Sequence, residues 1–143
     1  MPDTQAFPYP RAAVTVIVMK GNQILIGQRK GKNSDNTWGL PGGKLEMFEE
    51  LETCGERETM EECGVKIKNI RRGPYVNGMN YGAGKHYLTV ILIADWDSEE
   101  PQLKEPDKFY EWRWCKWEEI PKPIFYPLKL LVETGYRPPN ANN

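Results

Sequence analysis

Residues 43–65 read GKLEMFEELETCGERETMEECGV, and this stretch decides how the rest of the chain is interpreted. Good helix formers dominate residues 49–63, which contain no Pro and a single Gly, Gly55. Gly64 follows directly, and glycine commonly ends a helix because it adopts the left-handed backbone conformation without strain. The stretch therefore predicts one helix of about four turns over residues 49–63, preceded by a constrained loop.

The glutamates of this helix are not equivalent. A run of eight glutamates between positions 46 and 62 would by itself indicate a solvated helix face. At about 100° per residue, however, Glu58 and Glu62 continue the inward stripe that begins with Leu51, Cys54 and Gly55. Two inward carboxylates repel each other, and partial burial raises that cost unless cations neutralise them. A hard divalent cation suits such oxygen ligands, which favours Mg²⁺, with Mn²⁺ as a substitute.

The remaining sequence predicts a sheet around this helix. β-branched residues at 12–19 and apolar residues at 23–28 flank a Gly-containing turn, which predicts a hairpin. Further strands are expected at 67–71, 75–76, 87–94 and 110–115, loops at 31–37 and 98–108, and a second helix at 127–134. This order predicts an α+β fold in which helices cover both faces of a mixed sheet. We expect a single domain over residues 1–143, with a frayed tail at 138–143.

The composition excludes several classes of protein. The chain has 143 residues and a net charge of −1, which disfavours binding to polymeric nucleic acid or an anionic membrane. One His and three Cys without C-x-x-C spacing disfavour structural zinc. No apolar stretch approaches the ~18 residues of a membrane span, and residues 1–11 are too polar for a secretory signal. We expect a soluble cytoplasmic protein with reduced thiols, and the sequence leaves open whether it forms a homodimer.

The quoted stretch also resembles the Nudix box, G-x5-E-x7-R-E-U-x-E-E-x-G-U, in which U is apolar. Seven fixed positions agree, namely Gly43, Glu49, Arg57, Glu58, Glu61, Glu62 and Gly64. Two positions depart from the pattern: Thr59 replaces an apolar residue, and Phe48 stands where many members have Gly. The resemblance implies a Nudix-type α/β/α sandwich and hydrolysis of a phosphoric anhydride.

The resemblance implies roles for the acidic residues of the box. Glu58 and Glu62 would be the main metal ligands, Glu61 a direct or water-mediated ligand, and the Gly42 carbonyl a backbone ligand. These three glutamates are also the candidate catalytic residues, and Glu58 or Glu61 would accept the proton of the attacking water.

Other positions of the box have structural roles by the same resemblance. Arg57 and Glu49 would pair and hold the helix against the preceding loop. Gly43 and Gly64 would shape the loop and the helix end.

Candidate substrate contacts lie mostly outside the helix. Arg29 follows a predicted strand, so its guanidinium either binds phosphate or is simply solvated. Lys44 would reach a phosphate from the loop. Trp112 and Trp114 share one face of a predicted strand, and core packing is the simpler interpretation for both. Trp112 remains a candidate contact to the base.

Two further side chains, His86 and Tyr81, are candidates for a functional role. His86 is the only histidine, and we expect a structural role rather than a general base. Tyr81 lies at a distance from the box at which some dinucleoside-polyphosphate-cleaving Nudix enzymes place a tyrosine, but its neighbours Asn80 and Gly82 favour an ordinary loop residue.

Beyond the box, the chain is similar to the small MutT-type nucleoside triphosphate diphosphatases. This similarity rests on Arg29-Lys30, His86-Tyr87, Glu105-Pro106 and the Trp-rich segment at 112–121. It implies Mg²⁺-dependent hydrolysis of a nucleoside triphosphate to monophosphate and pyrophosphate, with 8-oxo-dGTP among the candidates and sanitation of the nucleotide pool as the role. In MutT-like members, water attacks the phosphorus next to the nucleoside-linked phosphate.

Two alternatives remain open. One is a Nudix hydrolase of ADP-ribose or dinucleoside polyphosphates, and the other is a catalytically weak nucleotide-binding module. The Pro-rich signature of NADH-cleaving members is not visible. In each case the expected partner is a small nucleotide, not a polymer or a membrane.

Overall fold

A computed structural model of the chain describes residues 6–32 and 34–139. Its elements are β1 (Arg11–Lys20), β2 (Gln23–Arg29), β3 (Trp38–Gly39), β4 (Gly42–Lys44), α1 (Leu51–Cys63), β5 (Lys66–Gly78), β6 (Tyr87–Ser98), β7 (Phe109–Lys116), the 3-10 helix η1 (Trp117–Glu119) and α2 (Tyr126–Glu133). Two predictions fall partly outside the described residues: residues 1–5 belong to the segment for which no secretory signal is expected, and residues 140–143 belong to the predicted frayed tail. Pro138, the first residue of that tail, is buried.

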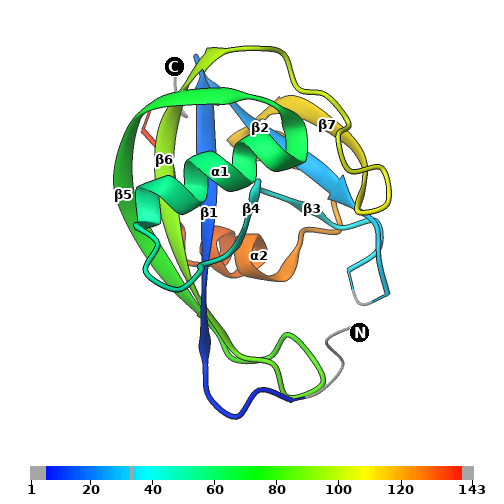
Figure 1. The fold of residues 1–143 in the computed structure, drawn as a ribbon. Helices are drawn as coiled ribbons and strands as arrows, with labels where there is room; N and C mark the ends of the chain where they lie inside the picture. Colours follow the sequence, from blue (N-terminus) through cyan, green and yellow to red (C-terminus); the bar gives the residue numbers. More distant parts are fainter. Residues whose placement is uncertain (1–5, 33, 140–143) are drawn as a thin grey trace.

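The seven strands form one mixed sheet (Figure 1). Its main order is β3-β2-β1-β6-β5, with β4 paired to β1 and β7 paired to β2. β1 and β6 run parallel, and the other pairs are antiparallel. The predicted hairpin is present, but β1 and β2 pair only at Met19↔Ile24 and Lys20↔Gln23. β2 then leaves β1 to pair with β7, and β4 occupies the place beside the first half of β1.

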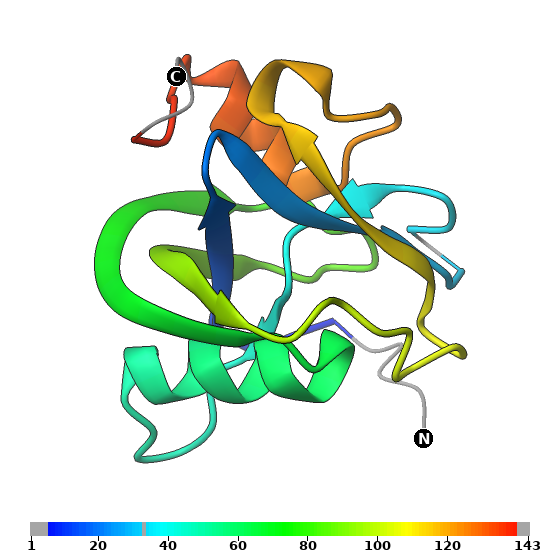
Figure 2. The same ribbon diagram turned by 90° about the horizontal axis from the view of Figure 1, so that it is seen from above.

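A helix covers each face of this sheet, as Figure 2 shows with α1 on one side of the strands and α2 on the other. Val14, Val16 and Leu92 belong to the core under α1, whereas Ile17 and Ile91 belong to the core under α2. This confirms the predicted α+β fold with a mixed sheet between helices.

Gly55 explains how α1 lies so close to the sheet. A Cβ atom at this position would lie 2.8 Å from Leu92 Cδ1 and 2.9 Å from Val16 Cγ2. The glycine weakens the helix slightly but removes the side chain that would hold it away from the strands. The carboxylates of α1 are thereby brought close to β1 and β4.

The element boundaries differ from the predictions in physically interpretable ways. α1 begins at Leu51 instead of residue 49, because Phe48 has a left-handed φ of 64° and Glu50 is extended. Its end is confirmed, with Gly64 at φ 73°. β5 is one strand of 13 residues instead of two short ones. β5 is an edge strand with irregular register, so it accommodates Gly73 and Pro74, which lie between the two predicted strands.

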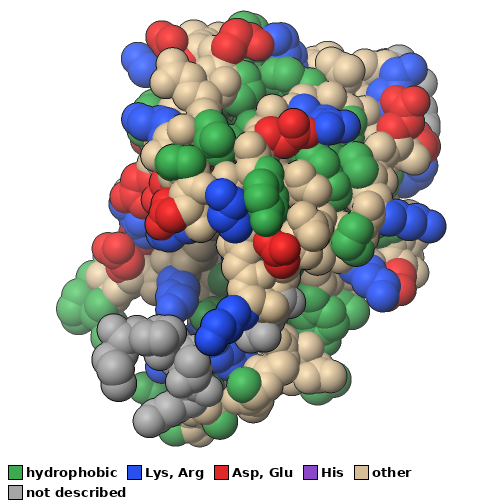
Figure 3. Space-filling view, turned by 90° about the vertical axis from the view of Figure 1, so that its right-hand side faces the viewer, with side chains coloured by type: hydrophobic (Ala, Val, Ile, Leu, Met, Phe, Trp, Pro, Cys, Tyr) green, Lys and Arg blue, Asp and Glu red, His purple; other side chains and the backbone are tan. Residues whose placement is uncertain are grey.

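On the face drawn in Figure 3, acidic and basic side chains are interspersed, with hydrophobic side chains between them. This matches the balance of 19 Lys and Arg against 20 Asp and Glu. Within the described part of the chain, no helix is long and apolar enough to cross a membrane.

Candidate active site

Arg57 connects α1 to the loop that precedes it. Its Nε and Nη2 atoms donate hydrogen bonds to the two carboxylate oxygens of Glu49, at 2.7 and 3.0 Å. This bidentate pair holds the pKa of Glu49 at about 2. Arg57 Nη1 also lies 2.8 Å from Glu58 and 3.3 Å from Glu61. The structure thus brings together the pair that the resemblance implied, and Arg57 orients two further carboxylates.

The glycine loop lies directly against the inward carboxylates. The backbone N–H of Gly42 donates to Glu62 Oε1 at 2.9 Å. A Cβ atom on Gly43 would lie 2.5 Å from the carboxylate carbon of Glu58. On the other side, a Cβ atom on Gly42 would lie 2.3 Å from the carbonyl oxygen of Val14 in β1. Only glycine lets the loop backbone pass between β1 and α1 at this distance.

Burial leaves the charge of Glu62 poorly compensated. Glu62 is buried, and desolvation raises its pKa to about 8, against the opposing effects of the Gly42 N–H and of Arg29. Burial also raises the pKa of Glu58, although its ion pair with Arg57 acts in the other direction. The charge of Glu58 also raises the pKa of Glu62, which shows that the two carboxylates interact electrostatically.

Glu105 is a fourth carboxylate at this point. It lies in the loop between β6 and β7, and its charge raises the pKa of both Glu58 and Glu62. Its backbone carbonyl accepts hydrogen bonds from Lys108 N and Phe109 N, which hold the loop in a turn. The sequence analysis included Glu105 only in a general similarity and assigned it no role, because an acid in a charged, Pro-containing loop has no periodic signature.

The donor set fits a hard divalent cation. Glu58, Glu62 and the Gly42 carbonyl offer oxygen ligands, whereas the half-exposed Glu61 lies against Arg57. In residues 6–32 and 34–139, no three His, Cys, Asp or Glu side chains converge as a ready-made metal cage. Mg²⁺ does not require one, since it is usually held by one or two carboxylates, waters and substrate phosphates.

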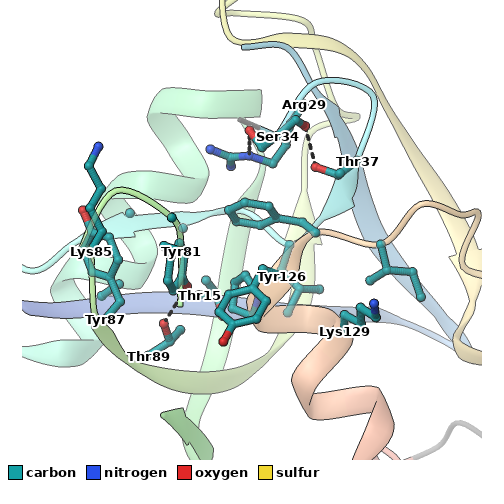
Figure 4. A pocket seen from close by; sticks show the side chains of 18 of the residues that line it. Thr15, Arg29, Ser34, Thr37, Tyr81, Lys85, Tyr87, Thr89, Tyr126 and Lys129 are labelled. Carbon is teal, nitrogen blue, oxygen red and sulfur yellow. Dashed lines mark hydrogen bonds between the residues drawn. The ribbon is translucent and has the colours of Figure 1, made fainter. Parts of the chain in front are cut away.

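A cleft of about 740 Å³ opens beside the glycine loop, on the α2 side of the sheet (Figure 4). Ala13 and Thr15 of β1 and Thr89 of β6 line it, and so do residues at the start of α2 and in the loop between β5 and β6. Gly42 and Gly43 also belong to its lining, so the loop that contacts the carboxylates borders the cleft as well.

Arg29 and Lys44, the two predicted phosphate contacts, both line this cleft. Arg29 Nε donates to Ser34 Oγ at 3.3 Å, and its guanidinium lies 4.0 Å from the ring centre of Phe125. Burial lowers the pKa of Arg29, and the charge of Glu62 raises it, so the two side chains interact electrostatically. Arg29 therefore connects the carboxylates to the cleft.

Trp112, the third predicted contact, lies elsewhere. It is not part of the cleft lining, and it packs 4.6 Å from Phe109 between ring centres, against the backbone of Gly27. Trp112 and Trp114 both pack on the core under α1, in agreement with the simpler interpretation.

Aromatic residues line the cleft instead. Tyr81 lies in the loop between β5 and β6, as expected, and it also lines the cleft. Its hydroxyl lies 3.4 Å from Thr89 Oγ1, and its ring centre lies 5.0 Å from that of Tyr126. Burial raises the pKa of Tyr81 to about 12. Phe125 and Tyr126 were not predicted as cleft residues, because they come from a Pro-rich segment that showed no functional pattern. His86 pairs with the side chain of Asn77 and is not part of the lining.

The comparisons with known proteins agree with this arrangement. The sequence profile of the NUDIX domain matches residues 9–138. The NAD-capped RNA hydrolase NudC of Escherichia coli is 31% identical over 116 residues, which are 79% of this chain and 42% of that protein. The chain thus spans less than half the length of the curated relatives it matches.

Solved structures give the same fold. A MutT NUDIX hydrolase from Burkholderia pseudomallei is similar with a TM-score of 0.81 and 27% identity, over 87% of this chain and 97% of that chain. The NUDIX domain of Shewanella oneidensis NrtR, complexed with ADP ribose, has a TM-score of 0.73 over 90% of this chain and 88% of its own. At 20% identity, the second likeness concerns the fold alone.

Proposed function

Because this chain belongs to the Nudix family, we propose that it is a metal-dependent pyrophosphohydrolase that converts a nucleoside triphosphate to monophosphate and pyrophosphate. One observation carries the proposal. The carboxylates of α1 contact a glycine loop that also lines a cleft, and every charged side chain lining that cleft is a cation. A polyphosphate joined to a nucleoside fits such a site, since it needs both a metal and positive charge along its length.

Mg²⁺, or Mn²⁺ in its place, would be held by Glu58, Glu62 and the Gly42 carbonyl, with Glu61 and Glu105 as nearby carboxylates. When bound, the ion neutralises phosphate oxygens and lowers the pKa of bound water. Glu58 or Glu61 accepts the proton of the attacking water, so one residue can serve both as metal ligand and as general base. The Arg57–Glu49 pair keeps these side chains in place.

Arg29 and Lys44 bind the phosphates on the cleft side. Arg29 is held by Ser34 and Phe125, so little side-chain freedom is lost when it binds an anion. With cations in the cleft and carboxylates beyond the glycine loop, a triphosphate lies along the loop. An internal anhydride bond is then nearest the carboxylates, and pyrophosphate is the expected product.

A second candidate is hydrolysis of ADP-ribose or a dinucleoside polyphosphate. The position of Tyr81 in the cleft favours it, and so does the ADP ribose complex of the NrtR domain. A catalytically weak binding module is disfavoured, because Glu58, Glu61 and Glu62 are all present.

A product assay separates these candidates. Deoxynucleoside triphosphates, ADP-ribose and a dinucleoside polyphosphate are incubated with Mg²⁺. Pyrophosphate, orthophosphate and the nucleotide products are quantified separately, because hydrolysis of ADP-ribose gives AMP and ribose 5-phosphate and neither inorganic ion. Pyrophosphate from a triphosphate is the expected result. Turnover of ADP-ribose alone would establish the second candidate, and nucleotide binding without turnover in saturating Mn²⁺ would indicate a binding module.

A further inference from the structure

We propose that the cleft binds the nucleobase by aromatic stacking and shape, and that the enzyme therefore discriminates only weakly among bases, including between oxidised and unmodified guanine. This inference rests on the proposed function and specifies its substrate class. It concerns the part of the cleft formed by Tyr81, Phe125 and Tyr126.

The lining contains few of the side chains that usually read a base. Specific contacts to base edges come mainly from Asn, Gln, Asp, Glu and bidentate Arg. Among the described residues that line the cleft there is no Asp, Glu, Gln or His, and Asn80 is the single carboxamide. Arg29, the one arginine in the lining, is turned to Phe125 and Ser34 and faces the charge of Glu62.

Several hydroxyl groups of the cleft have partners within the protein. The Tyr81 hydroxyl lies 3.4 Å from Thr89 Oγ1, and the Tyr126 hydroxyl accepts a hydrogen bond from Asn80 N at 3.2 Å. Each of these groups is therefore at least partly used by the fold. The capacity that remains, such as the Tyr126 proton, is that of single hydroxyl groups, which can both donate and accept and so do not select one base.

Two more hydroxyls, at the entrance near Arg29, are also engaged. Thr37 Oγ1 donates to Ser34 O at 2.6 Å, and Ser34 Oγ accepts from Arg29 Nε. Thr15 Oγ1 is the exception, since it is buried without a hydrogen-bond partner. A single hydroxyl both donates and accepts, so it can pair with an edge of any base and cannot select one.

The aromatic rings supply contact area instead. The Tyr81 ring lies 5.0 Å from Tyr126 at an interplanar angle of 85°, and 6.2 Å from Phe125 at 77°. In such edge-to-face pairs the edge of one ring covers part of the face of the other, and Tyr87 adds a third such contact to Tyr81 at 4.8 Å. Phe125 and Tyr126 are only half-buried and line the cleft, so part of each ring surface is accessible to a ligand. In Figure 4, Tyr81 and Tyr126 lie below Arg29, beside Thr15 and Thr89. A base placed among them stacks, and stacking tolerates every base because each has a π-face.

The expected selectivity follows from the type of contact. Sites that hydrogen-bond a substrate reject the wrong one by about 10⁴–10⁵, whereas sites that use shape and apolar contact discriminate by about 10–200-fold. Oxidation of guanine at C8 adds an oxygen and converts N7 from an acceptor to a donor. Among the described lining residues no carboxylate reads that change. The single carboxamide, Asn80, can turn to donate or accept and so does not by itself distinguish the two forms.

The direct test compares kcat/KM for the four deoxynucleoside triphosphates and 8-oxo-dGTP with the intact chain and Mg²⁺. We expect all five values within about 100-fold of one another. A larger preference for one base would overturn the inference while leaving the proposed function intact. Absence of turnover for every triphosphate would overturn both.

A variant test separates stacking from general damage. Tyr126→Ala should raise KM for every triphosphate by roughly ten-fold, while Tyr126→Phe, which keeps the ring, should remain within about three-fold of the wild type. Tyr75→Ala, an exposed tyrosine on β5 outside the cleft lining, is the matched control and should change nothing.

Inhibition by inorganic triphosphate, which has no base, completes the test. Its inhibition constant should be the same for Tyr126→Ala and the wild type. An increase equal to that of KM would mean that Tyr126 maintains the phosphate site, and an effect of Tyr126→Ala on one base only would mean that the cleft reads that base. Either result would contradict the inference.

Discussion

The carboxylate region and the cleft beside it differ in the parts of the chain that form them and in the interactions that hold them. Apart from Glu105, the carboxylate region comes from one contiguous stretch, residues 42–62. Arg57 holds this stretch together through ion pairs with Glu49, Glu58 and Glu61. The cleft collects side chains from β1, β6, the loop between β5 and β6, and the start of α2. Ring packing and neutral hydrogen bonds dominate there.

This difference indicates that the carboxylate region positions the reacting groups, whereas the cleft contributes mainly to substrate affinity. Charged groups at fixed distances determine how phosphates and metal are placed, and a small displacement is costly in such a site. Aromatic contacts are less directional, so changes in the cleft should alter affinity more than turnover. Substitutions in the two regions should therefore separate into effects on kcat and effects on KM.

The largest effect is expected from Glu62→Gln. Removing the negative charge of a metal ligand should lower kcat by about 10³-fold or more, because the metal ion that neutralises the phosphates is then held less well. The Gly42 N–H can still donate to the Gln side-chain oxygen, and the burial cost of a carboxylate disappears. The melting temperature in EDTA should therefore be unchanged or higher. More than about a tenth of wild-type activity in Mg²⁺, with an unchanged melting curve, would refute the ligand assignment.

Arg57→Ala should reduce stability and activity together. It leaves Glu49, whose side chain is only 9% exposed, without its bidentate partner, and it frees Glu58 and Glu61 to move. We expect a loss of about 2 kcal/mol in the free energy of unfolding and of roughly 100-fold in kcat. Arg72→Ala, which removes the exposed ion pair with Glu52, is the control and should leave the free energy of unfolding nearly unchanged. Full stability with lost activity would instead place Arg57 on the substrate.

Phe125→Leu tests the cleft in the same way. The ring lies 4.0 Å from the Arg29 guanidinium, and its removal should weaken phosphate binding by loosening that side chain. KM should rise about ten-fold, while kcat and the Mg²⁺ concentration for half-maximal rate stay within about two-fold. A fall in kcat larger than the rise in KM would show that the two regions are not separable.

The smallest effect is expected from Phe48→Gly. Phe48 is 99% exposed and has a left-handed φ of 64°, a conformation that strains any side chain but not glycine. The gain is partly offset by the greater freedom of glycine in the unfolded chain. The free energy of unfolding should rise by about 0.5 kcal/mol, measured by chemical denaturation, with unchanged kcat. A decrease would mean that the Phe48 ring stabilises the loop.

The same contrast explains what could be predicted from sequence. The end of α1 at Gly64, its inward face and the pairing of Arg57 with Glu49 depend on residues close together in one stretch, where spacing translates directly into geometry. The mixed sheet could be predicted for a similar reason, since its long strands are apolar and bounded by turns.

The cleft could not be predicted, because its residues meet only in the folded chain. Phe125 lies over Gly39 and under Arg29, and nothing in the local sequence of any of the three indicates the contact. Glu105 reaches the carboxylates from a loop after β6. The strand pattern of Trp112 favoured the core without excluding a base contact, and the packing places this residue in the core.

The most direct test of the proposed chemistry is to locate the bond that breaks. The reaction is run in ¹⁸O-labelled water with Mg²⁺ and the best deoxynucleoside triphosphate, and the products are analysed by mass spectrometry. Attack on the phosphorus next to the nucleoside-linked phosphate places the label in pyrophosphate, and the monophosphate stays unlabelled. Labelled orthophosphate as the first product would contradict the proposal, as would a label in the monophosphate.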